Sequence, residues 1–239
     1  MYLNKQEHRK IMLKVLEKIS ADSFLANNLG FKGGTACYFV HGLDRFSVDL
    51  DFDILNQNKE DKIKTAVIEL LKKFGTVKTK TSIKLNYNKG QQSLKVDLSN
   101  HYKNNSLNTY KIKDIISGVP LQILQKEDIF AHKLIALTSR SASSNDKDKF
   151  IANRDLYDLE FFFRNNWNFN EKIIEDQTGK SIVEYLKYAK KFIEKYVDEK
   201  NILARLGELV DDEKREWVKT NLKNEVLKYL TIEIESRRE

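Results

Sequence analysis

Hydrophobic and polar positions follow two different periods along the chain, and the change comes about halfway. In the first half, residues 47–54, 76–87 and 91–99 alternate apolar with polar side chains, which is the period of a β-strand with one buried face. Residues 3–20 and 58–74 show the longer period of an amphipathic helix. In the second half the helical period dominates, and it predicts helices over roughly 126–140, 153–165, 170–176, 181–197, 200–208 and 212–230.

Short polar or glycine-rich stretches separate these elements. We expect Gly30–Gly34 to form a turn that leads into a short helix over 35–40. The tripeptide Asn88-Lys89-Gly90 is typical of a hairpin turn between the second and third predicted strands. The polar, serine-rich segment 141–149 is predicted to be a loop.

This order of elements predicts an α+β fold class. We expect an α+β domain over residues 1–122 and a helical bundle domain over residues 123–239. The length of 239 residues suits one large or two modest domains, and the hydrophobic content of 41% is enough for a buried core.

The strand predicted over residues 47–54 carries an acid at every second position. Because strand side chains alternate between faces, Asp49, Asp51 and Asp53 should point the same way, with their apolar neighbours on the opposite face. Three carboxylates side by side repel one another. A divalent cation would relieve that repulsion, and Mg²⁺ favours one or two carboxylates together with substrate phosphates. The alternative is an acidic cluster with a purely structural role.

Positive charge is concentrated in the same half of the chain. Of the 42 Lys and Arg residues, 20 precede residue 126, against only 12 of the 35 Asp and Glu residues. Seven lysines and no acid lie between Glu69 and Asp97. A positive field around a metal site suits a polyanion such as a nucleotide or a nucleic acid. The alternative is an ordinary solvated lysine face.

Several functional classes are not supported by the sequence. With one cysteine, Cys37, the chain forms no internal disulfide, and its first residues do not resemble a signal peptide. No apolar stretch is long enough to span a membrane, so we expect a cytoplasmic protein that does not bind membranes. The phosphate-binding pattern Gly-x-x-x-x-Gly-Lys is absent, and no serine–histidine–acid pattern stands out.

Four motifs carry a resemblance to a known family. They occur in this order: Gly33-Gly34-Thr35, then Asp49-Leu50-Asp51-Phe52 after thirteen residues, then the stretch from Lys133 to Arg140, then Arg154-Asp155-Leu156-Tyr157-Asp158-Leu159. The first two resemble the signature of the DNA polymerase β-type nucleotidyltransferase superfamily. All four together are similar to the AbiEii/AbiGii toxin-type nucleotidyltransferases of bacterial toxin–antitoxin and phage-defence systems. The resemblance spans about residues 30–163 and implies a mixed sheet flanked by helices in the first domain.

The resemblance implies a catalytic metal site. Asp49 and Asp51 would hold Mg²⁺, or Mn²⁺, that bridges the phosphates of a nucleoside triphosphate. Asp97 would supply the third carboxylate, from a later strand. Asp53 competes with Asp97 for that place, and Asp97 is alternatively a surface acid paired with its neighbour Lys95.

The resemblance also implies a binding site for the triphosphate. Gly33 and Gly34 would let the backbone approach the phosphates closely, and the Thr35 hydroxyl would add a hydrogen bond near a helix N-terminus. Arg45 and Ser47 would either touch phosphate or hold the acidic strand in place.

The two later motifs supply further candidates. Lys133 would act catalytically by neutralising phosphate charge, and Arg140, on the same helical stripe, would help bind the substrate. Asp155 would orient Lys133 or contact the acceptor or base, and Asp158, three positions later, would bind substrate. The alternatives are a solvated helix face for Lys133 and a structural ion pair for the two aspartates.

These motifs together predict an enzyme that transfers a nucleoside monophosphate from an NTP to an acceptor and releases pyrophosphate. The resemblance implies that the acceptor is RNA, specifically tRNA, and that the protein is a toxin paired with an antitoxin. Two alternatives remain: a nucleotidyltransferase that modifies a protein or a small molecule, and a non-catalytic module that binds nucleotide or RNA.

Overall fold

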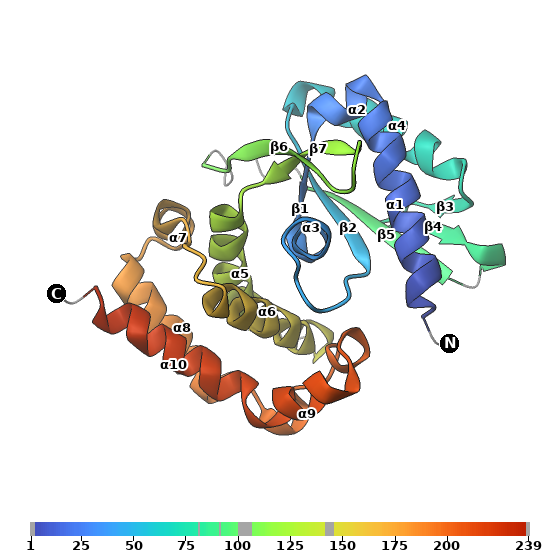
Figure 1. The fold of residues 1–239 in the computed structure, drawn as a ribbon. Helices are drawn as coiled ribbons and strands as arrows, with labels where there is room; N and C mark the ends of the chain where they lie inside the picture. Colours follow the sequence, from blue (N-terminus) through green and yellow to red (C-terminus); the bar gives the residue numbers. More distant parts are fainter. Residues whose placement is uncertain (1–2, 81, 91, 100–106, 142–145, 238–239) are drawn as a thin grey trace. The chain divides into compact units, whose positions relative to one another are not determined.

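The computed structural model describes residues 3–80, 82–90, 92–99, 107–141 and 146–237, and its contacts divide the chain into two compact units (Figure 1). The first unit consists of Met1–Gly42 and Phe46–Gln125. The second consists of Lys126–Glu239 together with the short segment Leu43–Arg45. The predicted domain boundary after residue 122 stays a prediction, because such a division does not show which parts fold alone.

The described residues of the first unit form a mixed seven-stranded sheet of order β3-β4-β5-β2-β1-β7-β6. Its central strand β2 is antiparallel to β1 and parallel to β5, and β7 is parallel to β1. The remaining neighbours pair antiparallel. The strands are β1 Leu29–Lys32, β2 Asp49–Ile54, β3 Thr76–Lys78, β4 Ile83–Tyr87, β5 Gln92–Ser99, β6 Tyr110–Asp114 and β7 Pro120–Leu124. The α+β class and the mixed sheet are confirmed.

Helices pack against one face of this sheet (Figure 1). The side chains on that face are apolar. Leu50, Leu85 and Leu94, on three neighbouring strands, are completely buried. Helix α1 covers this face, since its His8 ring bonds the hydroxyl of Tyr87, which shares a face with Leu85. Asn4 begins α1 by accepting a hydrogen bond from the Glu7 amide. The helices of the first unit are α1 Lys5–Ala21, α2 Ser23–Asn28, α3 Gly33–Val40 and α4 Glu60–Lys72.

The described helices of the second unit pack around aromatic side chains. The Phe130 ring contacts those of Phe162, Phe163 and Phe169, with ring centroids 4.8–5.3 Å apart. The Phe162 and Trp167 rings stack at 4.4 Å, so this aromatic run forms core. The helices are α5 Lys126–Ser141, α6 Asp146–Arg164, α7 Glu171–Thr178, α8 Ile182–Tyr196, α9 Asp212–Thr220 and α10 Leu222–Glu235.

Several predicted elements were wrong. The predicted single strand 76–87 is two antiparallel strands, β3 and β4, and the predicted turn at Gly30–Gly34 instead contains most of β1. Strands β6 and β7 were missed. The predicted helix 200–208 is two 3₁₀ turns, Glu199–Asn201 and Gly207–Leu209. Helix α6 begins at Asp146, inside the predicted loop, whose residues 142–145 lie outside the described part of the chain. The hairpin turn at Asn88–Gly90 is confirmed, and it joins β4 to β5.

Candidate active site

Strand β2 carries its acids on one face, as its alternation predicts. Leu50 and Phe52 are completely buried on the apolar face, while Asp49 and Asp51 are partly exposed on the other. Burial of the two apolar side chains sets the register of the strand, because a slip by one residue would turn every acid into the core. The hydrophobic pattern of the strand therefore makes both carboxylates point away from the core.

Strand β5 adds a third acid and a lysine to the same face. It runs parallel to β2, with Asp51 opposite Asp97 and Asp49 opposite Lys95. Residues directly opposite in a sheet share a face. The Lys95 ammonium bonds the Asp97 carboxylate. Burial lowers the pKa of Lys95, but Asp97, Asp49 and Asp51 together outweigh it, so the pKa lies above its ordinary value. The ammonium thus sits in the field of all three carboxylates.

Gly33 places the start of helix α3 against this acidic face. Its φ of +76° is in the left-handed region, which favours glycine. A Cβ atom built on Gly33 would lie 2.6 Å from Oδ2 of Asp51, so any side chain would displace that carboxylate. The glycine turn and the acidic strand, predicted separately, therefore meet.

Thr35 and Ser47 are hydrogen-bonded to each other next to the start of strand β2. The buried Thr35 hydroxyl contacts Ser47 Oγ at 2.7 Å and bonds the backbone carbonyl of Asp49. In this structure the hydroxyl acts within the protein, and its predicted contact with phosphate stays a prediction. Gly34, also buried, follows Gly33 in the first turn of α3.

Asp53 lies on the same face of β2 but bonds side chains from other strands. It is only 5% exposed. Its carboxylate accepts hydrogen bonds from Lys32 Nζ at 2.6 Å and from the Tyr110 hydroxyl at 2.6 Å. These partners tie Asp53 to β1 and β6, and the choice of Asp97 over Asp53 as the third acid stays a prediction.

The helical unit contains a separate charged network. Lys133 Nζ, on α5, lies 2.7 Å from Asp155 Oδ1 and 2.8 Å from Asp158 Oδ2, both on α6. Arg45 donates two hydrogen bonds to Asp158, from Nε at 2.6 Å and from Nη2 at 2.7 Å. Burial alone would raise the pKa of Asp158, but the charges of Arg45 and Lys133 hold it below its ordinary value.

The burial of this network bears on the predicted roles. Arg45 is 3% exposed and Asp158 is completely buried, so the geometry favours a structural pair over contact with substrate. Lys133 keeps 14% of its side chain exposed, and its predicted contact with phosphate stays a prediction. Arg140 lies in α5, and its side chain is outside the described part of the structure.

Sequence reasoning missed Asp44, which fastens the segment 43–45 to the helical unit. Its carboxylate accepts a hydrogen bond from the Tyr157 hydroxyl at 2.9 Å and pairs with Arg164 at 3.3 Å. Lys214 Nζ bonds the Asp44 carbonyl oxygen at 2.9 Å. These partners are at least 113 residues away along the chain, and no local pattern marks them.

His8 is a second residue without a sequence signal. Its Nε2 lies 2.8 Å from the carbonyl oxygen of Val48, the residue before Asp49. The ring is 1% exposed, and burial lowers its pKa below the ordinary 6.5, against smaller opposing effects of Val48 and Asp49. His8 therefore supports the start of β2 in its neutral form.

The buried His8 should make the fold weaken in acid. Below pH 6.5 the unfolded chain takes up a proton that the folded chain resists, so the free energy of unfolding should fall by up to about 1.4 kcal/mol per pH unit until the folded-state pKa is reached. Urea denaturation of the wild type and a His8→Gln variant between pH 7.5 and 5 measures this. An equal pH dependence in both proteins would show that His8 is not its source.

Two features are absent from the described part of the chain: a ready-made metal cluster and a membrane-spanning helix. Among the described residues, no three histidine, cysteine or acidic side chains lie close enough to hold a metal ion as they stand. Likewise, none of the described helices combines the length and the apolar character needed to cross a bilayer.

Comparison with known proteins adds a family and a fold. The sequence model of a family described as nucleotidyl transferase AbiEii toxin, type IV toxin–antitoxin system, matches residues 14–230. The solved structure of JHP933 from Helicobacter pylori is 22% identical with a TM-score of 0.50, covering 100% of this chain and 98% of its own. A second H. pylori structure, of a presumed nucleotidyltransferase, is 22% identical with a TM-score of 0.51, covering 97% and 98%. The comparison with curated proteins found no match.

Proposed function

The chain belongs to the AbiEii family of nucleotidyltransferase toxins, and from this premise we propose that it transfers a nucleoside monophosphate from an NTP to an RNA acceptor. It is a nucleotidyltransferase by family membership. In the proposed reaction, an RNA hydroxyl loses its proton and its oxygen bonds the α-phosphorus. The bond from that phosphorus to the bridging oxygen breaks, and pyrophosphate leaves. We further propose tRNA as the acceptor and a cognate antitoxin as a protein partner.

One observation carries the proposal: the Asp51 carboxylate lies against Gly33 at the start of helix α3. A helix N-terminus with glycine approach favours phosphate, and a neighbouring carboxylate pair favours a cation. An NTP chelated to a divalent metal presents both charges together. We assign Gly33 and Gly34 to the phosphates, and Thr35 and Ser47 to holding β2 beneath them.

The acids of the sheet suit a divalent metal by their chemistry. Asp49, Asp51 and Asp97 offer oxygen ligands on one face, and the Lys95 ammonium already occupies their shared field. We assign these three acids to Mg²⁺ or Mn²⁺. Such an ion, when bound, neutralises phosphate charge and lowers the pKa of an attacking hydroxyl.

In the helical unit we assign the charge-neutralising role to Lys133. Asp155 accepts a hydrogen bond from Lys133 Nζ at 2.7 Å, which fixes the direction of the ammonium. By contrast, Arg45 and Asp158 are assigned to positioning, because their charges satisfy each other in the interior. Arg140 stays a predicted substrate-binding residue.

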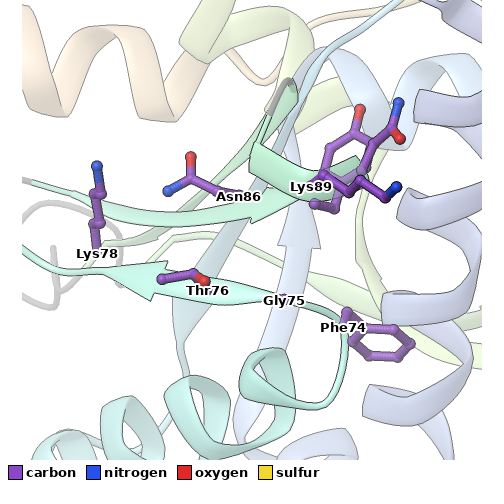
Figure 2. Close-up of a pocket in the computed structure, with 8 residues that line it drawn as sticks. Phe74, Gly75, Thr76, Lys78, Asn86 and Lys89 are labelled. Carbon is purple, nitrogen blue, oxygen red and sulfur yellow. The ribbon is translucent and has the colours of Figure 1, made fainter.

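A row of lysines supports an RNA acceptor. Lys78 on β3 is opposite Lys84 on β4, which is opposite Lys95 on β5, itself opposite Asp49. The row therefore leads from the acidic site to the sheet edge on a single face. A polar hollow of about 420 Å³ on β3 and β4 includes Lys78 and Asn86 in its lining (Figure 2). Such a row suits the regularly spaced phosphates of a nucleic acid.

The reaction is tested by incubating the protein with each α-labelled NTP, Mg²⁺ or Mn²⁺, and total RNA. We expect label on RNA from at least one NTP. Label on protein or on a small molecule instead would replace RNA as the acceptor. Intact NTP binding without any transfer would favour the non-catalytic alternative.

Reversing charge in the lysine row should weaken RNA use without affecting NTP binding. For Lys78→Glu with Lys84→Glu we expect about a tenfold rise in KM for RNA and a log–log salt dependence shallower by about 1.5, since two phosphate contacts are lost. The matched control is Lys111→Glu with Lys113→Glu, on strand β6 at the far edge of the sheet. Equal effects from both pairs would contradict a defined RNA track.

A further inference from the structure

The Lys95 ammonium lies among the three acids that we assign to the metal. It projects from β5 directly opposite Asp49, two residues before Asp97 on the same strand. Its ammonium bonds the Asp97 carboxylate and interacts electrostatically with Asp49 and Asp51 as well. A single monovalent charge thus serves all three carboxylates that we assign to a divalent metal.

The neighbouring lysine shows that this placement is specific. Lys84 lies opposite Lys95 on β4, on the same face, and its side chain is exposed. The side chain of Lys95 is only 39% exposed, and that of Asp97 35%. An isolated ion pair at this exposure contributes little, but here the two remaining carboxylates add to the attraction.

The bond to Lys95 also sets the direction of the Asp97 carboxylate. Asp97 is directly opposite Asp51, yet no three acidic side chains among the described residues are grouped to hold a metal. An Asp97 carboxylate engaged with Lys95 is oriented along its own strand, toward that ammonium. A divalent ion shared by Asp97, Asp49 and Asp51 would therefore compete with the Lys95 ammonium for the Asp97 carboxylate.

We propose that Lys95 is a resident counter-ion of the metal site, displaced when a divalent metal binds, so that it couples metal binding to nucleotide binding. Without nucleotide, the metal has to evict a cation from its three carboxylates, and binding is weak. With a triphosphate present, the displaced ammonium gains phosphate oxygens as new partners. This coupling is reciprocal: metal and nucleotide each strengthen the binding of the other. The proposal rests on the proposed metal-dependent function.

The test compares Mn²⁺ binding to the wild type, Lys95→Met and Lys84→Met, by electron paramagnetic resonance and calorimetry. Without nucleotide, we expect Lys95→Met to bind Mn²⁺ roughly tenfold more tightly than wild type, because one competing positive charge is gone. Lys84→Met, which removes a charge from the same face without touching the acids, should bind like the wild type. A nonhydrolysable NTP should then improve Mn²⁺ binding less in Lys95→Met than in the wild type.

Two further measurements keep the result interpretable. Lys95→Arg preserves the charge and should restore wild-type Mn²⁺ affinity. Thermal unfolding should show Lys95→Met less stable than wild type without metal and stabilised more by Mn²⁺, since its three carboxylates lose the positive charge of Lys95. This readout also reports whether the variant is folded.

Each outcome decides the proposal. Equal or weaker Mn²⁺ binding by Lys95→Met overturns the counter-ion role while leaving the metal site intact. Tighter Mn²⁺ binding by both Lys95→Met and Lys84→Met also overturns it, because the loss of any nearby positive charge would then explain the tighter binding. If no protein binds Mn²⁺, with or without nucleotide, the metal site itself fails, and with it the proposed metal dependence.

Discussion

Changing Asp49 and Asp51 together to asparagine is expected to reduce nucleotidyl transfer at least a thousandfold while leaving the protein folded. Asparagine keeps the shape of each side chain but removes the charge that holds a cation. The loss of several kcal/mol of transition-state stabilisation corresponds to a factor of this size. Transfer of label from NTP to RNA, followed over time, measures it.

The control for this variant is Asp114→Asn. Asp114 is an exposed aspartate on β6, at the edge of the same sheet and three strands away from β2. The Asp114→Asn variant should transfer label to RNA at the wild-type rate. If the Asp49 and Asp51 double variant transfers label at the wild-type rate and has a normal circular dichroism spectrum, the acidic strand has no role in the chemistry.

Asp158→Ala is expected to cost about 3–5 kcal/mol of unfolding free energy, because it leaves the Arg45 guanidinium buried without its carboxylate. Lys133 also loses one of its two carboxylates. Urea denaturation at pH 7 measures the change. The same buried geometry predicts a comparable cost for Arg45→Ala.

An exposed ion pair provides the matched control. Lys219 and Glu216 on α9 approach to 2.6 Å, with side chains 48% and 74% exposed. Lys219→Ala should change stability by less than about 1 kcal/mol, since water replaces the lost contact. Should Asp158→Ala keep full stability but lose transfer, the positioning role would be wrong, and the predicted substrate-binding role would gain support.

Local patterns predicted the parts of the site that depend on a few neighbouring residues. The alternation from Asp49 to Ile54 predicted which acids share a face, because Leu50 and Phe52 have to be buried. The glycine pair predicted a turn, and Gly33 does require its left-handed backbone. Asp97 was placed on a later strand by resemblance, and the structure puts it opposite Asp51.

Local patterns failed where a neighbouring strand decided the structure. Strand β1 has four residues, too few to show a period, and Gly30 made it look like a turn. It is a strand because β2 and β7 supply hydrogen bonds on both sides. Residues 76–87 alternate throughout, so nothing in their pattern showed the reversal between β3 and β4.

By itself, then, the sequence determined the chemistry available and the face on which each strand presents it, because hydrophobic burial acts residue by residue. Only the tertiary structure decided the partners. It engaged Asp53 with Lys32 and Tyr110, buried Arg45 against an aspartate 113 residues away, and set Lys95 among the acids. Charged side chains pair with the charges that lie close to them in space, and these distances are fixed only when the whole chain has folded.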